Sequence, residues 1–189
     1  MDRLAREPIR NARELEFAVF CIENVADAMG LPSDAVYRAL TGPSDILNQY
    51  IVPSYDVLHT QGRDYIVNDI REVMAERGVF DERPDDRPSA SAVAKSPNLP
   101  AYAGGTGNVD VQGERDEMRA NKNLLRMKFA RVVEAYAQRT GCSLDEALKT
   151  FYGSQTYVLM RDGIADMHCM SIPYLVEEIL SEREHADNP

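Results

Sequence analysis

Two histidine-containing phrases carry the residue types and spacing that could do chemistry in this chain. His59 opens HTQGRDYIVNDI and His168 opens HCMSIPYLVEEI, and the chain has only three histidines in all. Tyr65 and Tyr174 stand at the same place in their phrases. Because histidine titrates near neutral pH, it can serve as a general base, a metal ligand or a partner contact. The repetition indicates either a repeated site or one small fold built twice.

The chemical interpretation of His59 and His168 lacks the groups that it would need. General base catalysis requires a second group of matched pKa within hydrogen-bonding reach. The nearest acids, Asp56 and Asp166, do not occupy the same aligned position, and neither H-x-x-x-H nor H-E-x-x-H spacing occurs. A histidine at a helix entry can instead bond exposed backbone groups. Loop anchoring, partner contact and chemistry all remain open for both histidines, and the sequence favours loop anchoring.

Two repeated glutamates and two repeated tyrosines complete the candidate set. Glu23 and Glu134 lie among apolar neighbours, where an acid is paired or placed at the edge of the core. Each tyrosine is predicted to be a core ring whose hydroxyl reaches the surface. We predict no catalytic, cofactor-binding or metal-binding residue, no cofactor and no enzymatic activity. The candidate partner-binding or structural residues are His59, Tyr65, Glu23, His168, Tyr174 and Glu134.

The helices that must position these residues are themselves repeated. IENVADAMGLPSDAVYRAL begins at Ile22 and VEAYAQRTGCSLDEALKTF at Val133, 111 positions further on. This alignment places Gly30 on Gly141, and each glycine follows apolar residues at helical spacing, as a helix stop does. A period this long indicates two domain copies. The predicted fold is all-α, with two small three-to-four-helix domains related by duplication.

A segment with a different composition separates the two copies. Residues 81–114 are rich in Pro, Gly, Ser and Asp, which predicts a flexible, disordered linker between a first copy at 1–80 and a second at 115–189. In the first copy Ser33 is the expected cap of the second helix. In the second copy, Ser143 and Glu146 form a capping-box pattern.

Composition restricts the class of partner. The formal net charge is −10, which opposes broad contact with a phosphate backbone and disfavours nucleic acid. No apolar run approaches the ~18 residues of a membrane span, and the charged N-terminal stretch lacks a secretory signal, so a cytoplasmic protein is expected. The three cysteines form no C-x-x-C pair, which predicts free, buried thiols. No small-molecule substrate is predicted.

A DNA-binding alternative comes from the turn around Gly30. Ala26, Gly30 and Val36 have helix-turn-helix spacing, because a small residue lets two helices approach and glycine accepts the turn. A DNA-reading helix also needs basic or amide side chains, and Arg38 is the one basic residue of this second helix. A helix-turn-helix DNA-binding regulator therefore remains the alternative function.

The chain also resembles a family of short bacterial proteins of unknown function. ELEFAVFCIENVADAMG and YIVPSYDVLHTQGRDYIVNDIREVMAERGV resemble one branch, while MKFARVVEAYAQRTGCSLDEALKTFYGSQTY and GIADMHCMSIPYLVEEI resemble a related one. Members are commonly encoded beside a gene for an ADP-ribosyltransferase-like protein. The resemblance therefore implies two fused companions that act as a non-catalytic, antitoxin-like accessory protein on such a partner. It supplies no catalytic residues.

Overall fold

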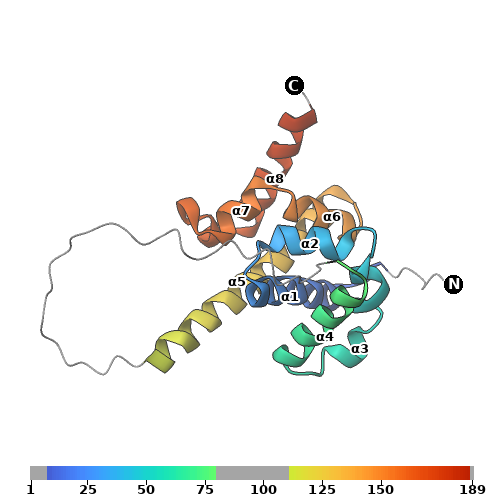
Figure 1. Cartoon of the computed structure of the whole chain (residues 1–189). Coiled ribbons are helices and arrows are strands. Elements are labelled where there is room, and N and C mark those ends of the chain that lie inside the picture. Colours follow the sequence, from blue (N-terminus) through green and yellow to red (C-terminus); the bar gives the residue numbers. More distant parts are fainter. Residues whose placement is uncertain (1–7, 80–110, 188–189) are drawn as a thin grey trace, which may run out of the picture.

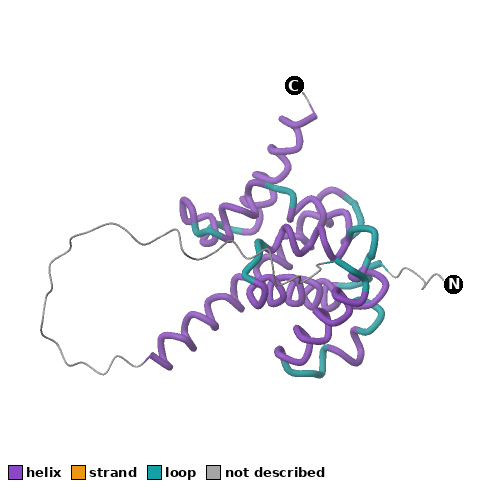
Figure 2. Tube along the Cα trace, in the orientation of Figure 1, coloured by secondary structure: helices purple, strands orange, loops and turns teal. Residues whose placement is uncertain are grey.

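The structure is a computed structural model, and it describes residues 8–79 and 111–187, with side chains described at 8–79 and 122–185. Every regular element in these residues is a helix, which confirms the all-α prediction (Figure 2). The predicted linker lies mostly outside the described residues. None of the helices in the described ranges has the length and apolarity needed to cross a membrane.

The first helical region contains two long helices separated by shorter pieces. Its elements in chain order are α1 (Ala12–Met29), α2 (Ser33–Thr41), η1 (Leu47–Ile51), α3 (Tyr55–Leu58) and α4 (Arg63–Glu76). The spacing of Ile66, Ile70, Val73 and Met74, with the stop at Gly78, predicts α4 over nearly the same residues, 63–77. The short element η1 is a single π-helical turn, an uncommon conformation that often occurs at functional sites.

The second helical region has the same order of long and short elements. It contains α5 (Val111–Thr140), α6 (Leu144–Tyr152), α7 (Gln155–Arg161), η2 (Ile164–Cys169) and α8 (Ile172–Asp187). The helix α5 begins four residues inside the predicted linker, whose end at 114 was placed by its Pro- and Gly-rich composition. In Figure 1 the beginning of α5 projects away from the other helices.

The two regions share one hydrophobic core, a question that the sequence left open. α1 lies at the centre and packs against α2, α4 and α5 (Figure 1). Apolar residues occur on more than one side of α1, so both the first and the second region can cover it. Leu15, Ile22 and Val25 of α1 are buried in the same cluster as Phe129 and Val133 of α5. Neither region therefore buries α1 alone.

Local signals fix the ends of these helices. Gly30 and Gly141 end α1 and α5 with left-handed φ angles of 64° and 73°, as the glycine stops predict. Ser143 and Glu146 form the predicted capping box at α6. The predicted cap at α2 is wrong: Pro32 holds the cap position, and the Ser33 hydroxyl donates to a buried carboxylate instead.

The three cysteines differ in burial. All three are free thiols, as expected, but Cys21 is the one that is buried. Cys142 is half-buried and Cys169 is exposed, so the prediction of three buried thiols is wrong. Cys169 ends the short η2 element, where its neighbours Met170 and Ile164 are also exposed, because that turn lies at the surface.

The capping box of α6 yields a test of local stability. Ser143→Ala removes the hydroxyl that accepts from the Glu146 N–H, and we expect it to lower the free energy of unfolding by about 1 kcal/mol. Ser171→Ala is the matched control, since that hydroxyl accepts from the Tyr174 N–H at 3.4 Å without a capping box, and its loss should be smaller. Urea unfolding followed by circular dichroism measures both. Equal losses would contradict this account of the capping box.

Candidate functional site

Two groups of side chains lie where the helical regions meet. The first is a buried set of oxygen atoms, the Glu23 cluster, formed by Glu23, Ser33, Tyr152 and Tyr157. The second is the aromatic cleft, a hollow of about 380 Å³ between α1, α3 and α5. Its lining residues are Arg13, Glu16, Phe17, Phe20, Tyr55, His59, Asn123, Arg126 and Met127.

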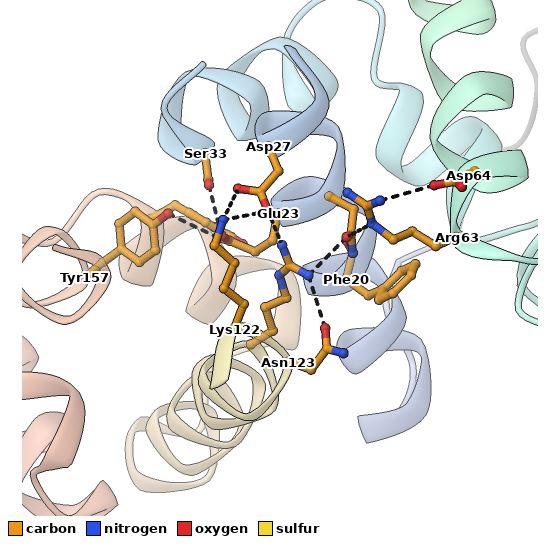
Figure 3. A network of polar contacts seen from close by, with 12 residues as sticks. Phe20, Glu23, Asp27, Ser33, Arg63, Asp64, Lys122, Asn123 and Tyr157 are labelled. Atoms are coloured by element: carbon orange, nitrogen blue, oxygen red, sulfur yellow. Dashed lines mark hydrogen bonds and ion pairs between the residues drawn. The ribbon is translucent and has the colours of Figure 1, made fainter. Parts of the chain in front are cut away.

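The Glu23 cluster joins three helices to the middle of α1. The Glu23 side chain is 7% exposed, and one carboxylate oxygen accepts from the hydroxyls of Tyr152 at 3.0 Å and Tyr157 at 3.1 Å. The other oxygen accepts from the Ser33 hydroxyl at 3.0 Å. Figure 3 shows Ser33 and Tyr157 directed at Glu23. Since both tyrosines belong to the second region, this carboxylate holds the two regions together.

Burial controls the protonation of this cluster. Desolvation raises the pKa of Glu23 above its ordinary value, and the three hydroxyl donors oppose that rise only in part. Burial beside Glu23 also raises the pKa values of Tyr152 and Tyr157, so both phenols remain protonated donors. The described partners satisfy the carboxylate, and the cluster is enclosed. Its chemistry is therefore suited to assembly of the fold rather than to a reaction.

An ionic network lies beside the Glu23 cluster on the same helix. The buried Asn24 amide oxygen accepts from Arg63 Nε at 2.6 Å and from Arg126 Nη1 at 3.0 Å. Arg126 Nη2 also contacts Asp27 Oδ2 at 2.6 Å, and Lys122 reaches the same carboxylate at 3.2 Å (Figure 3). These bonds tie α4 and α5 to the last turns of α1. They also hold the Arg126 guanidinium at the floor of the aromatic cleft.

Stacked rings form one wall of the aromatic cleft. The ring centroids of Tyr55 and His59 lie 4.5 Å apart and the rings are nearly parallel, while Phe17 meets Tyr55 edge-on at 5.4 Å. His59 Nδ1 lies 2.6 Å from the Tyr55 carbonyl oxygen. Because a carbonyl oxygen only accepts, Nδ1 carries a proton and donates it to that oxygen. His59 thus anchors its own loop and presents a flat ring to the cleft.

The other wall of the cleft comes from the second region. Met127 of α5 is 45% exposed, and Arg126 beside it is held by Asn24 and Asp27. On α1, Arg13 is exposed and makes no ion pair within the described parts of the chain. Aromatic, methionine and arginine side chains are those enriched in protein–protein interfaces. The cleft therefore has the composition of a protein-binding surface.

The two histidines do not share a site. His168 belongs to η2 and does not line the aromatic cleft. Lys128 Nζ donates to the His168 carbonyl oxygen at 2.6 Å, and the buried His168 Nδ1 has no hydrogen-bond partner among the described residues. Glu134 likewise differs from Glu23, since it is half-buried and its one hydrogen bond within the described residues is a 3.5 Å bond from Gln138 of its own helix. Identical residues at aligned positions of the two regions therefore have different structural environments.

The predicted core tyrosines lie at the surface. Tyr65 is 57% exposed and Tyr174 is 45% exposed, so the prediction of core rings is wrong at both positions. Each stands in the first turn of its helix, and the packed face begins at the next residue, Ile66 or Leu175. The buried tyrosines of the described residues are Tyr37, Tyr136, Tyr152 and Tyr157, and the first two lie within the repeated helical segments.

Residues 8–79 and 111–187 contain no cluster of candidate metal ligands. No group of three or more His, Cys, Asp or Glu side chains there is arranged to hold a metal ion. The acids that the sequence offered as histidine partners, Asp56 and Asp166, form no described bond to either histidine.

The Glu23 cluster makes a prediction about stability at neutral pH. Glu23→Ala leaves the buried Tyr152 and Tyr157 hydroxyls without their acceptor, and it should lower the free energy of unfolding by about 2 kcal/mol or more. Glu23→Gln should stay within about 1 kcal/mol of the wild type, since its amide oxygen can accept both phenols and its NH₂ can donate to Ser33. Urea unfolding of the two variants measures the difference. Equal losses would contradict the proposed hydrogen-bonding role.

The raised pKa of Glu23 makes a prediction about pH. In the unfolded chain this carboxyl titrates near its ordinary value, about 4.3, whereas in the folded chain it retains its proton to higher pH. The folded state thus binds more protons, and the Glu23 contribution is fully present below the unfolded pKa and lost as pH rises through the folded one. The free energies of unfolding of the wild type and Glu23→Gln are measured from pH 5 to pH 8. As pH rises, the wild type should lose stability relative to the variant. A constant difference would refute the raised pKa.

Comparison with known proteins reaches part of the chain. A family described as "Protein of unknown function (DUF3791)" matches residues 16–77. No curated protein and no solved structure matches the chain. The matched residues run from the first turns of α1 to the end of α4 and include His59 and Glu23. The first helical region is therefore similar to a family of unknown function.

Proposed function

We propose that this chain is a non-catalytic accessory protein, antitoxin-like, that binds an ADP-ribosyltransferase-like partner protein through the aromatic cleft. The observation that carries the proposal is the cleft itself, where aromatic, methionine and arginine side chains from both helical regions line one hollow. The identity of the partner rests on the family resemblance of the sequence. The match of residues 16–77 to a family of unknown function supports the resemblance for the first region.

The chemistry of the cleft favours a protein segment with an apolar anchor and an acidic neighbour. Phe17, Tyr55 and His59 offer flat apolar surface, and Met127 offers a flexible one that adapts to an inserted side chain. Arg126 is already paired with Asp27 at 2.6 Å, so Arg13 is the cation that an acidic residue of the partner would meet, beside the carboxylate of Glu16. Aromatic and arginine residues in a partly desolvated hollow are typical hot spots of binding energy.

We also infer that the two regions are tandem copies of one ancestral domain. The order of long and short helices is the same in both, and Gly30 and Gly141 take the same left-handed conformation at matching positions. The different surroundings of Glu23 and Glu134 are expected of copies that pack on one another asymmetrically. Duplication with such divergence produces a surface that neither copy has alone.

The packing of α2 supports protein binding over DNA reading. In the helix-turn-helix alternative, α2 is the helix that would enter the major groove. Its Tyr37 ring instead stacks on Tyr152 of α6 at 4.9 Å, and Val36 and Leu40 are buried. Arg38 of α2 is paired with Asp34 of the same helix at 2.9 Å. The basic side chain that α2 could offer to a phosphate is therefore already neutralised.

Co-expression with the product of the neighbouring gene, which the proposal expects to be an ADP-ribosyltransferase-like protein, tests the proposal. The wild-type pair should co-purify at micromolar concentration. Met127→Asp places a charge in the cleft and should weaken the complex at least about tenfold. Leu124→Asp is the matched control: Leu124 is 64% exposed one turn earlier on α5 and does not line the cleft, so this variant should bind like the wild type.

Three results would each contradict this proposed function. The wild-type proteins could fail to associate, or both aspartate variants could bind equally well. A salt-dependent mobility shift of the protein on its own promoter would instead favour the DNA-binding alternative. Circular dichroism of both variants ensures that a binding loss is not a loss of fold.

A further inference from the structure

The first region binds the second through one surface made of α1 and α2. The residues that define this α1/α2 face are Glu23, Asn24, Asp27 and Tyr37. Tyr37 stacks on Tyr152 at 4.9 Å, and Glu23 accepts from the Tyr152 and Tyr157 hydroxyls. All three cysteines are free thiols, so no disulfide joins the two regions. A second region supplied by another copy of the chain could therefore make the same contacts.

Helices at corresponding places in the two regions pack on one another. α1 packs on α5, and α2 packs on α6. Asp27 near the end of α1 contacts Lys122 in the early part of α5. Ile9, which precedes α1, donates its N–H to Asp145, which follows α5, so the two helices run in opposite directions. Pairing of corresponding elements is what the interface of a two-fold dimer shows.

Ion pairs make the α1/α2 face selective. Asp27 contacts Arg126 Nη2 at 2.6 Å and Lys122 Nζ at 3.2 Å. The Arg126 side chain is only 11% exposed, and its Nη1 also donates to the Asn24 amide oxygen at 3.0 Å (Figure 3). A guanidinium held in this way needs its acceptors, because a buried charge without partners is costly. The face thus requires cations from the helix that covers it.

The first region of another copy does not supply these cations. At the 111-residue offset, the first region has Asn11 where the second has Lys122. It likewise has Leu15 in place of Arg126, and Leu15 is buried in the core. Two first regions brought together would leave Asp27 without a positive partner from the opposite helix. The occupant that fits the α1/α2 face is therefore a second region.

We propose that two copies of this chain exchange their second regions, so that the α1/α2 face of each copy binds the second region of the other. The dimer contains the same junction twice, and each aromatic cleft takes Phe17 and His59 from one copy and Met127 from the other. Covalently joined regions have an effective concentration on the order of 1 mM, so the monomer prevails in dilute solution and the dimer forms at high concentration. The exchange does not depend on which partner the cleft binds.

Reversal of one ion pair tests the exchange with full-length chains. Asp27→Arg and Arg126→Asp each place like charges across the junction of their own chain. In an equimolar mixture refolded from urea, exchange brings opposite charges together at one junction and restores the natural pair at the other. Light scattering and mass spectrometry should show that most of the refolded protein is a dimer containing one chain of each variant. Each variant refolded alone should give no more dimer than the wild type.

The double variant Asp27→Arg/Arg126→Asp is the matched control, since it carries the opposite charges within one chain. It should refold as a monomer, like the wild type at the same concentration. If a single variant does not fold alone, circular dichroism should show that its fold is recovered in the mixture. A mixture that yields no mixed dimer, while the double variant refolds, would overturn the proposal.

The wild type gives a measurement that does not depend on the variants. When it is refolded at increasing concentration, the ratio of dimer to monomer should rise in proportion to the monomer concentration, as mass action requires. Absence of dimer after refolding at millimolar concentration would also overturn the exchange. None of these measurements contains a partner of the aromatic cleft, so a failure here is distinct from a failure of the proposed function.

Discussion

The structure depends on one buried carboxylate that is solvated by the protein itself. Taking a glutamate out of water is costly unless donors replace its hydration shell. Glu23 receives hydroxyl groups from Ser33 of its own region and from Tyr152 and Tyr157 of the other. The full set of donors exists only when the two regions are packed together. This requirement makes the pair of regions, rather than either one, the unit that buries α1.

The same constraint creates the surfaces available for binding. α1 carries Glu23, Asn24 and Asp27 within one turn, and each binds side chains of the second region. The aromatic cleft lies on this junction and takes its lining residues from both regions. The proposed protein-binding surface therefore depends on the packing of the two regions. Two helical regions that meet asymmetrically create a surface that neither region has alone.

Part of the candidate site was predictable and part was not. His59 was expected to anchor a loop or contact a partner, and it bonds the Tyr55 carbonyl while it lines the aromatic cleft. Tyr65 was wrongly predicted to lie in the core. It stands in the first turn of α4, next to the buried face of that helix, and its ring is exposed. Ser33 was misassigned because a distant carboxylate competed with the helix end for its hydroxyl.

The sequence by itself determined the local features: helical periodicity, the stops at Gly30 and Gly141, and the capping box at Ser143. These depend on neighbours within about four residues, so the local sequence specifies them. Only the tertiary structure decided that Glu23 is buried against tyrosines more than a hundred positions away, and that Glu134, its aligned counterpart, is not. Burial of a charge is a property of the assembled surroundings, because the donors that offset its desolvation come from elsewhere in the chain.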